Sequence, residues 1–219
     1  MSSMGGGLGS IPSLQELSQY NVNRPNAVEA ICQSMYDSAT YAQAGQVSLQ
    51  FFQTPQGQSG KTLANTNMTS AGAMPAPQSF LIQAIELYFI PGENPSVQGA
   101  HAASAFVNDT FVFWTTPAWL QLFVGSKAYL QEAPLIKFPP MNGLSGFSGQ
   151  SDATTAAATG FTGTSYATAS GPIYEMNPPV LLVPTQNFTI TLNWNTAQSI
   201  TAAATVYCSL RGVLYRNSQ

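Results

Sequence analysis

The chain has a single histidine, His101, so most histidine-dependent chemistry would have to be built around this residue. His101 lies among small residues at 97–104, and its closest carboxylate along the chain is Asp109. A Ser–His–Asp triad also needs a positioned serine, and no Gly-x-Ser-x-Gly turn accompanies this histidine. We therefore interpret His101 as a loop residue near a subunit contact and not as a catalyst.

Carboxylates are the other candidate catalytic groups. A glycosidase needs two of them about 5–10 Å apart, and the chain has nine. Glu86 stands out because it lies in the middle of an apolar run, where a catalytic acid would have a raised pKa. The preferred interpretation is structural: a solvent-side position, or an ion pair with Lys127 or Lys137. A cupin-type metal site would need several histidines. We therefore predict no catalytic, cofactor-binding or metal site, and no enzyme.

Tryptophans beside polar residues raise a second possibility, carbohydrate binding. Trp114, Trp119 and Trp194 are available, and Asn108 and Asp109 lie close to the first of them. Trp114 and Trp194 fall in register with apolar residues, which indicates packing in a core. A lectin-like module therefore stays an alternative, with Trp119 as the residue whose mutation would test it.

Charge is scarce in this chain. Six basic and nine acidic residues make up 7% of 219 residues, against roughly 25% in an average domain. Nucleic-acid binding by phosphate neutralisation needs a basic patch, so no direct nucleic-acid binding is expected. The apolar run at 80–91 is far shorter than the roughly 20 residues of a membrane-spanning helix. The first ten residues lack the basic and apolar regions of a secretory signal.

The N-terminal residues 1–45 are predicted to form a partly helical arm. Ser13 and Glu16 match a capping box, which predicts a short helix over 13–20. A second helix is predicted to start near Asn26, because apolar residues follow at the spacing i, i+3, i+4, i+7. These residues are Val28, Ile31, Cys32 and Met35. Such an apolar face needs a partner surface, on its own domain or on a neighbouring subunit.

Residues 46–219 are predicted to form an all-β domain of about eight strands. Strand-like runs occur at 47–51, 80–90, 106–114, 120–124, 128–130, 135–138, 180–183, 188–194 and 201–214. No helix-period segment separates them, so parallel crossovers are not expected and the sheets should be antiparallel. Eight strands over this length predict a single jelly-roll β-sandwich. An immunoglobulin-like sandwich is the alternative, although it usually has shorter loops.

Cys32 and Cys208 can be either a disulfide or two buried thiols, and the thiols are the preferred interpretation. A long loop rich in Gly, Ser, Thr and Ala is predicted at 141–172. Its aromatic residues Phe147, Phe161 and Tyr166 indicate that it packs on another surface.

A surface of neutral polar side chains has little charge to prevent association, and such groups cost less to desolvate than ionised ones. We therefore predict a homo-oligomer whose surface is mostly interface. Its predicted subunit contacts lie in the arm and in the long loop. They are Val28, Ile31, Met35, Phe147, Phe161 and Tyr166.

The order of segments resembles that of a known family. The segments are 48–55, 66–72, 74–80, 184–194 and 210–216, and they resemble the jelly-roll capsid proteins of tailless icosahedral bacterial viruses (bacteriophages). The resemblance implies a structural protein of the virion that self-assembles into capsomers, with itself and other virion proteins as partners. It implies no cofactor. The alternative is a lectin-like receptor-binding module, such as a spike or fibre head, on a jelly roll.

Overall fold

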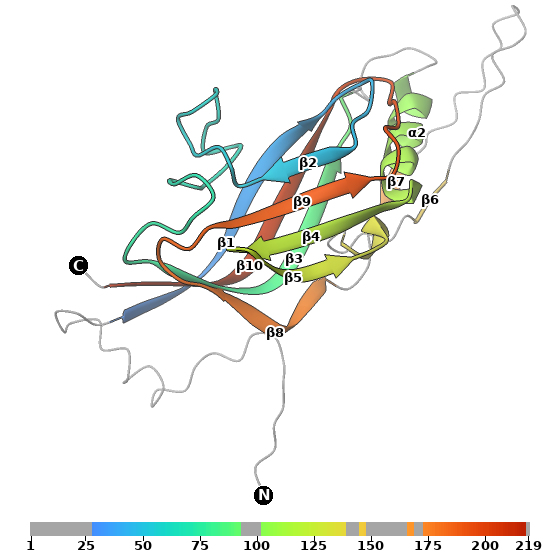
Figure 1. Ribbon diagram of the computed structural model, residues 1–219. Helices are drawn as coiled ribbons and strands as arrows, with labels where there is room; N and C mark the ends of the chain where they lie inside the picture. Colours follow the sequence, from blue (N-terminus) through green and yellow to red (C-terminus); the bar gives the residue numbers. More distant parts are fainter. Residues whose placement is uncertain (1–27, 93–101, 139–144, 148–165, 169–172, 218–219) are drawn as a thin grey trace, which may run out of the picture.

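The computed structural model describes residues 28–92, 102–138, 145–147, 166–168 and 173–217. Two four-stranded antiparallel sheets pack face to face and form an all-β sandwich (Figure 1). The first sheet has the order β1 (Val28–Tyr41), β10 (Ala204–Asn217), β3 (Ser79–Ile90) and β8 (Tyr174–Leu182). The second has the order β2 (Ser48–Phe51), β9 (Phe188–Trp194), β4 (Ala118–Val124) and β5 (Lys127–Glu132).

The eight strands of the sandwich pair in a nested order. The strand β1 pairs with β10, β2 with β9, β3 with β8 and β4 with β5, and each of these pairs is antiparallel. The chain therefore follows the path of one long hairpin whose successive strand pairs alternate between the two sheets. The nesting brings strands from opposite ends of the sequence together, with Val28 opposite Asn217.

The core lies between the sheets, and two-residue alternation decides which side chains enter it. In β9 the apolar residues predicted from the alternation at 188–194 point inward, and Ile190 and Leu192 are fully buried. In β4 every second residue is buried, with Leu120 and Leu122 fully enclosed. The predicted strands at 47–51, 80–90, 120–124 and 188–194 are confirmed within a residue or two.

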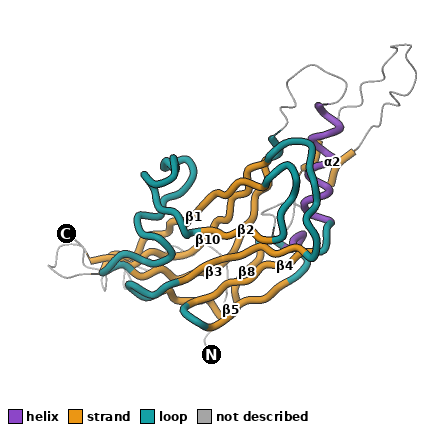
Figure 2. The backbone as a smooth tube through the Cα atoms, turned by 45° about the horizontal axis from the view of Figure 1, so that its top comes forward, coloured by secondary structure: helices purple, strands orange, loops and turns teal. Residues whose placement is uncertain are grey.

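The predicted strand at 106–114 is wrong, because these residues belong to the helix α2 (Ala102–Thr115). This helix lies at one end of the sandwich (Figures 1 and 2). Asp109 and Phe113 are buried four positions apart, whereas Phe111 between them is 48% exposed. A short apolar run does not distinguish a buried strand from a buried helix, because its residues suit either period.

The helix predicted to start near Asn26 is also wrong. Residues 28–41 form β1, which pairs with β10 over its whole length. They therefore belong to the first sheet and not to an arm ending at residue 45. Met35, Asp37 and Tyr41 face the core at strand spacing. The predicted helix at 13–20 lies outside the described residues.

The predicted strand at 135–138 is instead the 3₁₀ turn η1 (Leu135–Lys137). Pro134 precedes it, and Leu135 and Phe138 both enter the core. Residues three apart share one side of a 3₁₀ turn, which explains how both side chains are buried.

Asp109 attaches α2 to the segment that leads into β10. Its buried carboxylate accepts hydrogen bonds from the Thr201 backbone N–H at 2.8 and 3.0 Å and from the Thr201 hydroxyl at 2.9 Å. Replacing Asp109 with Asn should lower the free energy of unfolding by about 1–3 kcal/mol, because an amide NH₂ would replace one acceptor. Urea unfolding measures this change. The exposed Glu175→Gln is the control, and an equal midpoint for both variants would contradict the role of Asp109.

Candidate interaction surfaces

The predicted contact residues of the N-terminal segment do not lie on one face. Val28 is 47% exposed near the end of β1, and Ile31 is half-buried opposite Leu214. Met35 is 5% exposed and belongs to the hydrophobic core between the two sheets. Alternate residues of a strand point to opposite faces, so the helical stripe that grouped these residues does not exist.

Two of the contact residues predicted in the long loop lie opposite each other. A two-stranded ribbon pairs β6 (Ser145–Phe147) with β7 (Tyr166–Thr168), and Phe147 is the register partner of Tyr166. Phe161 lies outside the described residues. Subunit contacts at these positions stay predictions.

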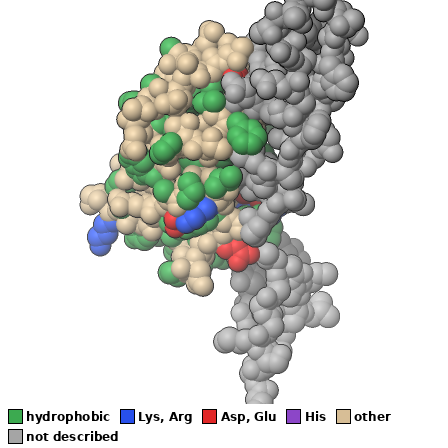
Figure 3. All heavy atoms as spheres, turned by 90° about the vertical axis from the view of Figure 1, so that its right-hand side faces the viewer, with side chains coloured by type: hydrophobic (Ala, Val, Ile, Leu, Met, Phe, Trp, Pro, Cys, Tyr) green, Lys and Arg blue, Asp and Glu red, His purple; other side chains and the backbone are tan. Residues whose placement is uncertain are grey.

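Most charged side chains in the described part of the chain are already paired. Eight of its eleven charged residues form four ion pairs, and the ninth, Asp109, binds Thr201. The pairs are Asp37–Lys61 at 2.6 Å, Glu86–Arg211 at 3.1 Å, Glu132–Lys137 at 2.7 Å and Glu29–Arg216 at 2.7 Å. On the face seen in Figure 3, uncharged side chains cover most of the described surface. Little free charge therefore opposes contact between molecules.

Glu86 has a structural role. Its side chain is buried and accepts bonds from the Arg211 guanidinium and from the Tyr88 hydroxyl, both at 3.1 Å. The predicted solvent-side position and the predicted pairing with Lys127 or Lys137 are both wrong, because Glu86 is buried and pairs with Arg211, whereas Lys137 pairs with Glu132. Burial, and then the Glu86 charge, raises the pKa of Tyr88.

The two cysteines are free thiols. Cys32 lies opposite Val213, whereas Cys208 lies opposite Asp37. The two are therefore about five strand positions, or roughly 17 Å, apart along the sheet, beyond the Cα distance of about 7 Å that a disulfide can span. The prediction of buried thiols is confirmed for Cys208, where burial raises the pKa well above its ordinary value. It is wrong for Cys32, which is exposed.

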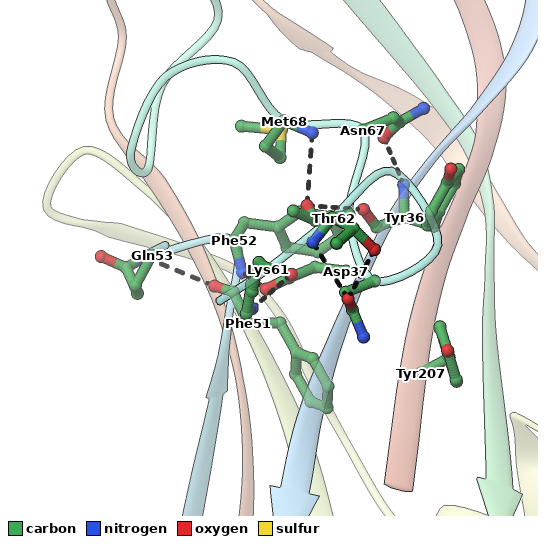
Figure 4. A network of polar contacts seen from close by, with 12 residues as sticks. Tyr36, Asp37, Phe51, Phe52, Gln53, Lys61, Thr62, Asn67, Met68 and Tyr207 are labelled. Atoms are coloured by element: carbon green, nitrogen blue, oxygen red, sulfur yellow. Dashed lines mark hydrogen bonds and ion pairs between the residues drawn. The ribbon is translucent and has the colours of Figure 1, made fainter. Parts of the chain in front are cut away.

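The loop between β2 and β3 covers part of the free edge of β1. Its Asn67 side chain accepts a bond from the Tyr36 backbone N–H at 2.9 Å and donates one to the Ser34 carbonyl at 2.8 Å. The Thr66 hydroxyl donates to the Tyr36 carbonyl at 3.0 Å. An unpaired strand edge is a template for unwanted pairing, and these contacts occupy it at this point. Figure 4 shows the bond between Asn67 and Tyr36.

An ion pair attaches the same loop to β1. Asp37 is fully buried in β1. Its carboxylate forms an ion pair with the Lys61 ammonium and accepts a hydrogen bond from the backbone N–H of Phe52 (Figure 4). Phe52 has a φ of 67°, which turns the chain sharply out of β2. The buried charge therefore fixes both the start and the middle of the loop.

A small cleft lies between this loop and the first sheet. Its volume is about 120 Å³, room for about four water molecules. Its lining includes Met35, Met68, Met74, Asn67 and Gln78. No group of three or more His, Cys, Asp or Glu side chains that could hold a metal occurs in the described part of the chain. None of its helices is long and apolar enough to cross a membrane.

The outer face of the second sheet combines aromatic rings with uncharged polar groups. Trp119, Gln121 and Phe123 alternate with buried residues along β4, so they point away from the core. Gln121 lies in a row of four register partners that crosses the whole sheet. This row is Gln50, Thr191, Gln121 and Gln131. Asn193 lies opposite both Trp119 and Ser48.

No protein-family model, no curated protein and no solved structure matches this chain. The function is therefore argued from the strand order, the surfaces and their chemistry.

Proposed function

We propose that this protein is a structural subunit of an icosahedral viral shell, folded as a single jelly roll, that assembles with copies of itself. The observation that carries the proposal is the nested pairing of eight strands in two four-stranded sheets. A jelly roll is an eight-stranded double sheet built from two Greek keys. Viral capsid and lectin domains use this architecture. Within this class, the order of segments along the chain favours a capsid protein, because it resembles that of bacteriophage capsid proteins.

The charge distribution supports self-assembly. Among the described residues, Lys127 and Glu175 are the charged side chains without an ion-pair partner or a buried hydrogen bond. The core of a stable interface is depleted of charged residues. A surface with so few unpaired charges can be buried against another copy without leaving a charged side chain buried and unpaired.

An apolar row supports a specific contact surface. Cys32, Val213, Leu81 and Leu181 are successive register partners across the outer face of the first sheet. Leu181 is 48% exposed, and Val213 and Leu81 are half-buried. Contiguous exposed apolar surface of this kind marks interaction sites. The proposal places a neighbouring copy on this row.

Light scattering after chromatography, with negative-stain images of the same peak, tests the proposal. Rings or shells of one protein are expected. A monomer of 23.2 kDa, or a trimer that does not grow with concentration, would overturn the shell proposal and favour a receptor-binding module.

A charged residue in the apolar row should weaken assembly. Leu181→Lys buries an unpaired ammonium in the proposed contact, and we expect the assembled fraction to fall about tenfold or more, equivalent to at least 1.4 kcal/mol. The matched control is Val47→Lys, because Val47 is 56% exposed and lies directly before β2, the edge strand of the other sheet. Equal assembly of the two variants would show that the row is not the contact.

A further inference from the structure

Over three of its four strands, the outer face of the second sheet is built from aromatic and neutral polar side chains. Its outward positions on β2, β9 and β4 hold no charged residue. They are Ser48, Gln50, Thr189, Thr191, Asn193, Trp119, Gln121 and Phe123. Every one of them is either aromatic or a neutral hydrogen-bonding residue, which suits an uncharged polar ligand.

Hydrogen bonds orient the polar groups of this face. The Asn193 amide donates to the Gln121 carbonyl oxygen at 3.0 Å and to the Thr191 hydroxyl at 3.2 Å. The Ser48 hydroxyl donates to the Asn193 oxygen at 3.2 Å. These bonds fix Asn193 and Gln121 before any ligand arrives, which lowers the entropy cost of binding.

Two rings lie on either side of the polar row. Trp119 and Phe123 are half-buried, four positions apart on the same face of β4, which places them about 13 Å apart. Gln121 lies between them, and the exposed Gln50 and Gln131 extend its row to both edges of the sheet. Among the described residues neither of these two glutamines has a hydrogen-bond partner through its side chain, so their amides are available to a ligand.

A neutral oligosaccharide matches this surface. A sugar ring presents C–H groups that pack on an aromatic face and hydroxyl groups that both donate and accept hydrogen bonds. Amides of Gln and Asn also do both. A nucleic acid would need cations that this face lacks, and an apolar peptide would leave the polar row without partners. Two rings this far apart suit separate units of a chain better than a single sugar.

We propose that the outer face of the second sheet binds a neutral oligosaccharide laid along β4. Trp119 and Phe123 stack on its sugar rings, and Gln121 with its row partners binds the hydroxyl groups. This binding function is additional to shell assembly and does not depend on it.

The test is a glycan array probed with the full-length protein, followed by calorimetric titration of the neutral oligosaccharide that binds best. Trp119→Ala and Gln121→Glu should each weaken binding about tenfold or more, since one loses a stacking ring and the other replaces the amide donor of Gln121 with a charged acceptor. Gln121→Glu keeps the size of the side chain and tests the site even if Trp119→Ala unfolds. Phe111→Ala on α2, 48% exposed, is the control and should bind as the unmodified protein does.

Three outcomes would overturn the proposal. They are an array with no neutral glycan bound, preference for acidic glycans, or binding that neither variant weakens. The array is repeated with Leu181→Lys, so that a face covered by assembly is distinguished from a face that does not bind. Binding by the unmodified protein in a form that does not assemble would support this inference while counting against the shell.

Discussion

Replacing Phe113 with alanine should lower the free energy of unfolding by about 3–5 kcal/mol, the usual cost of removing a buried aromatic ring. Phe113 is 1% exposed. Its ring stacks on Phe89 at 4.4 Å between centroids and meets Tyr41 edge-on at 5.8 Å and Trp194 at 5.7 Å. These contacts join α2 to β1, β3 and β9, so the substitution leaves a cavity where three strands and the helix meet.

Urea unfolding followed by tryptophan fluorescence measures the loss. A domain of this size is stable by about 5–15 kcal/mol, so the Phe113→Ala midpoint should move far to lower urea. The matched control is Phe111→Ala on the same helix, where an exposed side chain should cost about 0.5 kcal/mol or less. Similar losses for the two variants would show that α2 does not contribute to the core as described.

Replacing Lys61 with methionine should have an effect of similar size, about 3–5 kcal/mol, because it leaves a buried carboxylate without its counter-charge. The side chain of Asp37 is 1% exposed and that of Lys61 is 19% exposed. Methionine preserves most of the length of the lysine side chain while removing the ammonium. The remaining partner of Asp37 would be the backbone N–H of Phe52. Equilibrium urea unfolding measures the change.

A double variant separates the lost charge from lost packing. Asp37→Asn combined with Lys61→Met removes both charges and retains an oxygen for the Phe52 N–H, so it should be more stable than Lys61→Met alone. Lys137→Met is the control, because the Lys137–Glu132 pair is exposed and should contribute about 0–1 kcal/mol. If Lys61→Met costs no more than this control, the buried pair does not stabilise the loop.

Strands buried on one face were predictable from the sequence. In β9, Phe188, Ile190, Leu192 and Trp194 alternate with polar residues, and the same alternation decides burial in the structure. The period of a strand is a local property, because each residue's face follows from the residue before it. The strand-like runs similarly predicted antiparallel sheets, although the expectation that no helix separates them was wrong, because α2 lies between β3 and β4.

Elements with ambiguous spacing were not predictable. The apolar residues between Val28 and Met35 fit a helical spacing, yet β10 supplies a pairing partner for every residue of β1. That partner lies more than 160 residues away along the chain, so no window around β1 contains it. The opposite error occurred at 106–114, where the apolar run predicted a buried strand but the residues form the helix α2.

The ion pairs and the row of polar side chains were not predictable for the same reason, because their members come together only in the tertiary structure. Asp37 and Lys61 are distant from each other in sequence, as are Glu86 and Arg211, and only the folded sheets bring each pair together. The row from Gln50 to Gln131 takes one residue from each of four strands. Trp119 could be selected from the sequence as a possible sugar contact, but its polar neighbours could not.

By itself the sequence determined the class of fold, the residues that enter the core of its clearest strands and the scarcity of charge, because composition and two-residue periodicity are local properties. Tertiary structure decided which strands pair, that β1 is a strand and α2 a helix, and which polar groups share a surface. The physical reason is that backbone pairing and side-chain burial depend on partners far along the chain, whose position no local pattern specifies.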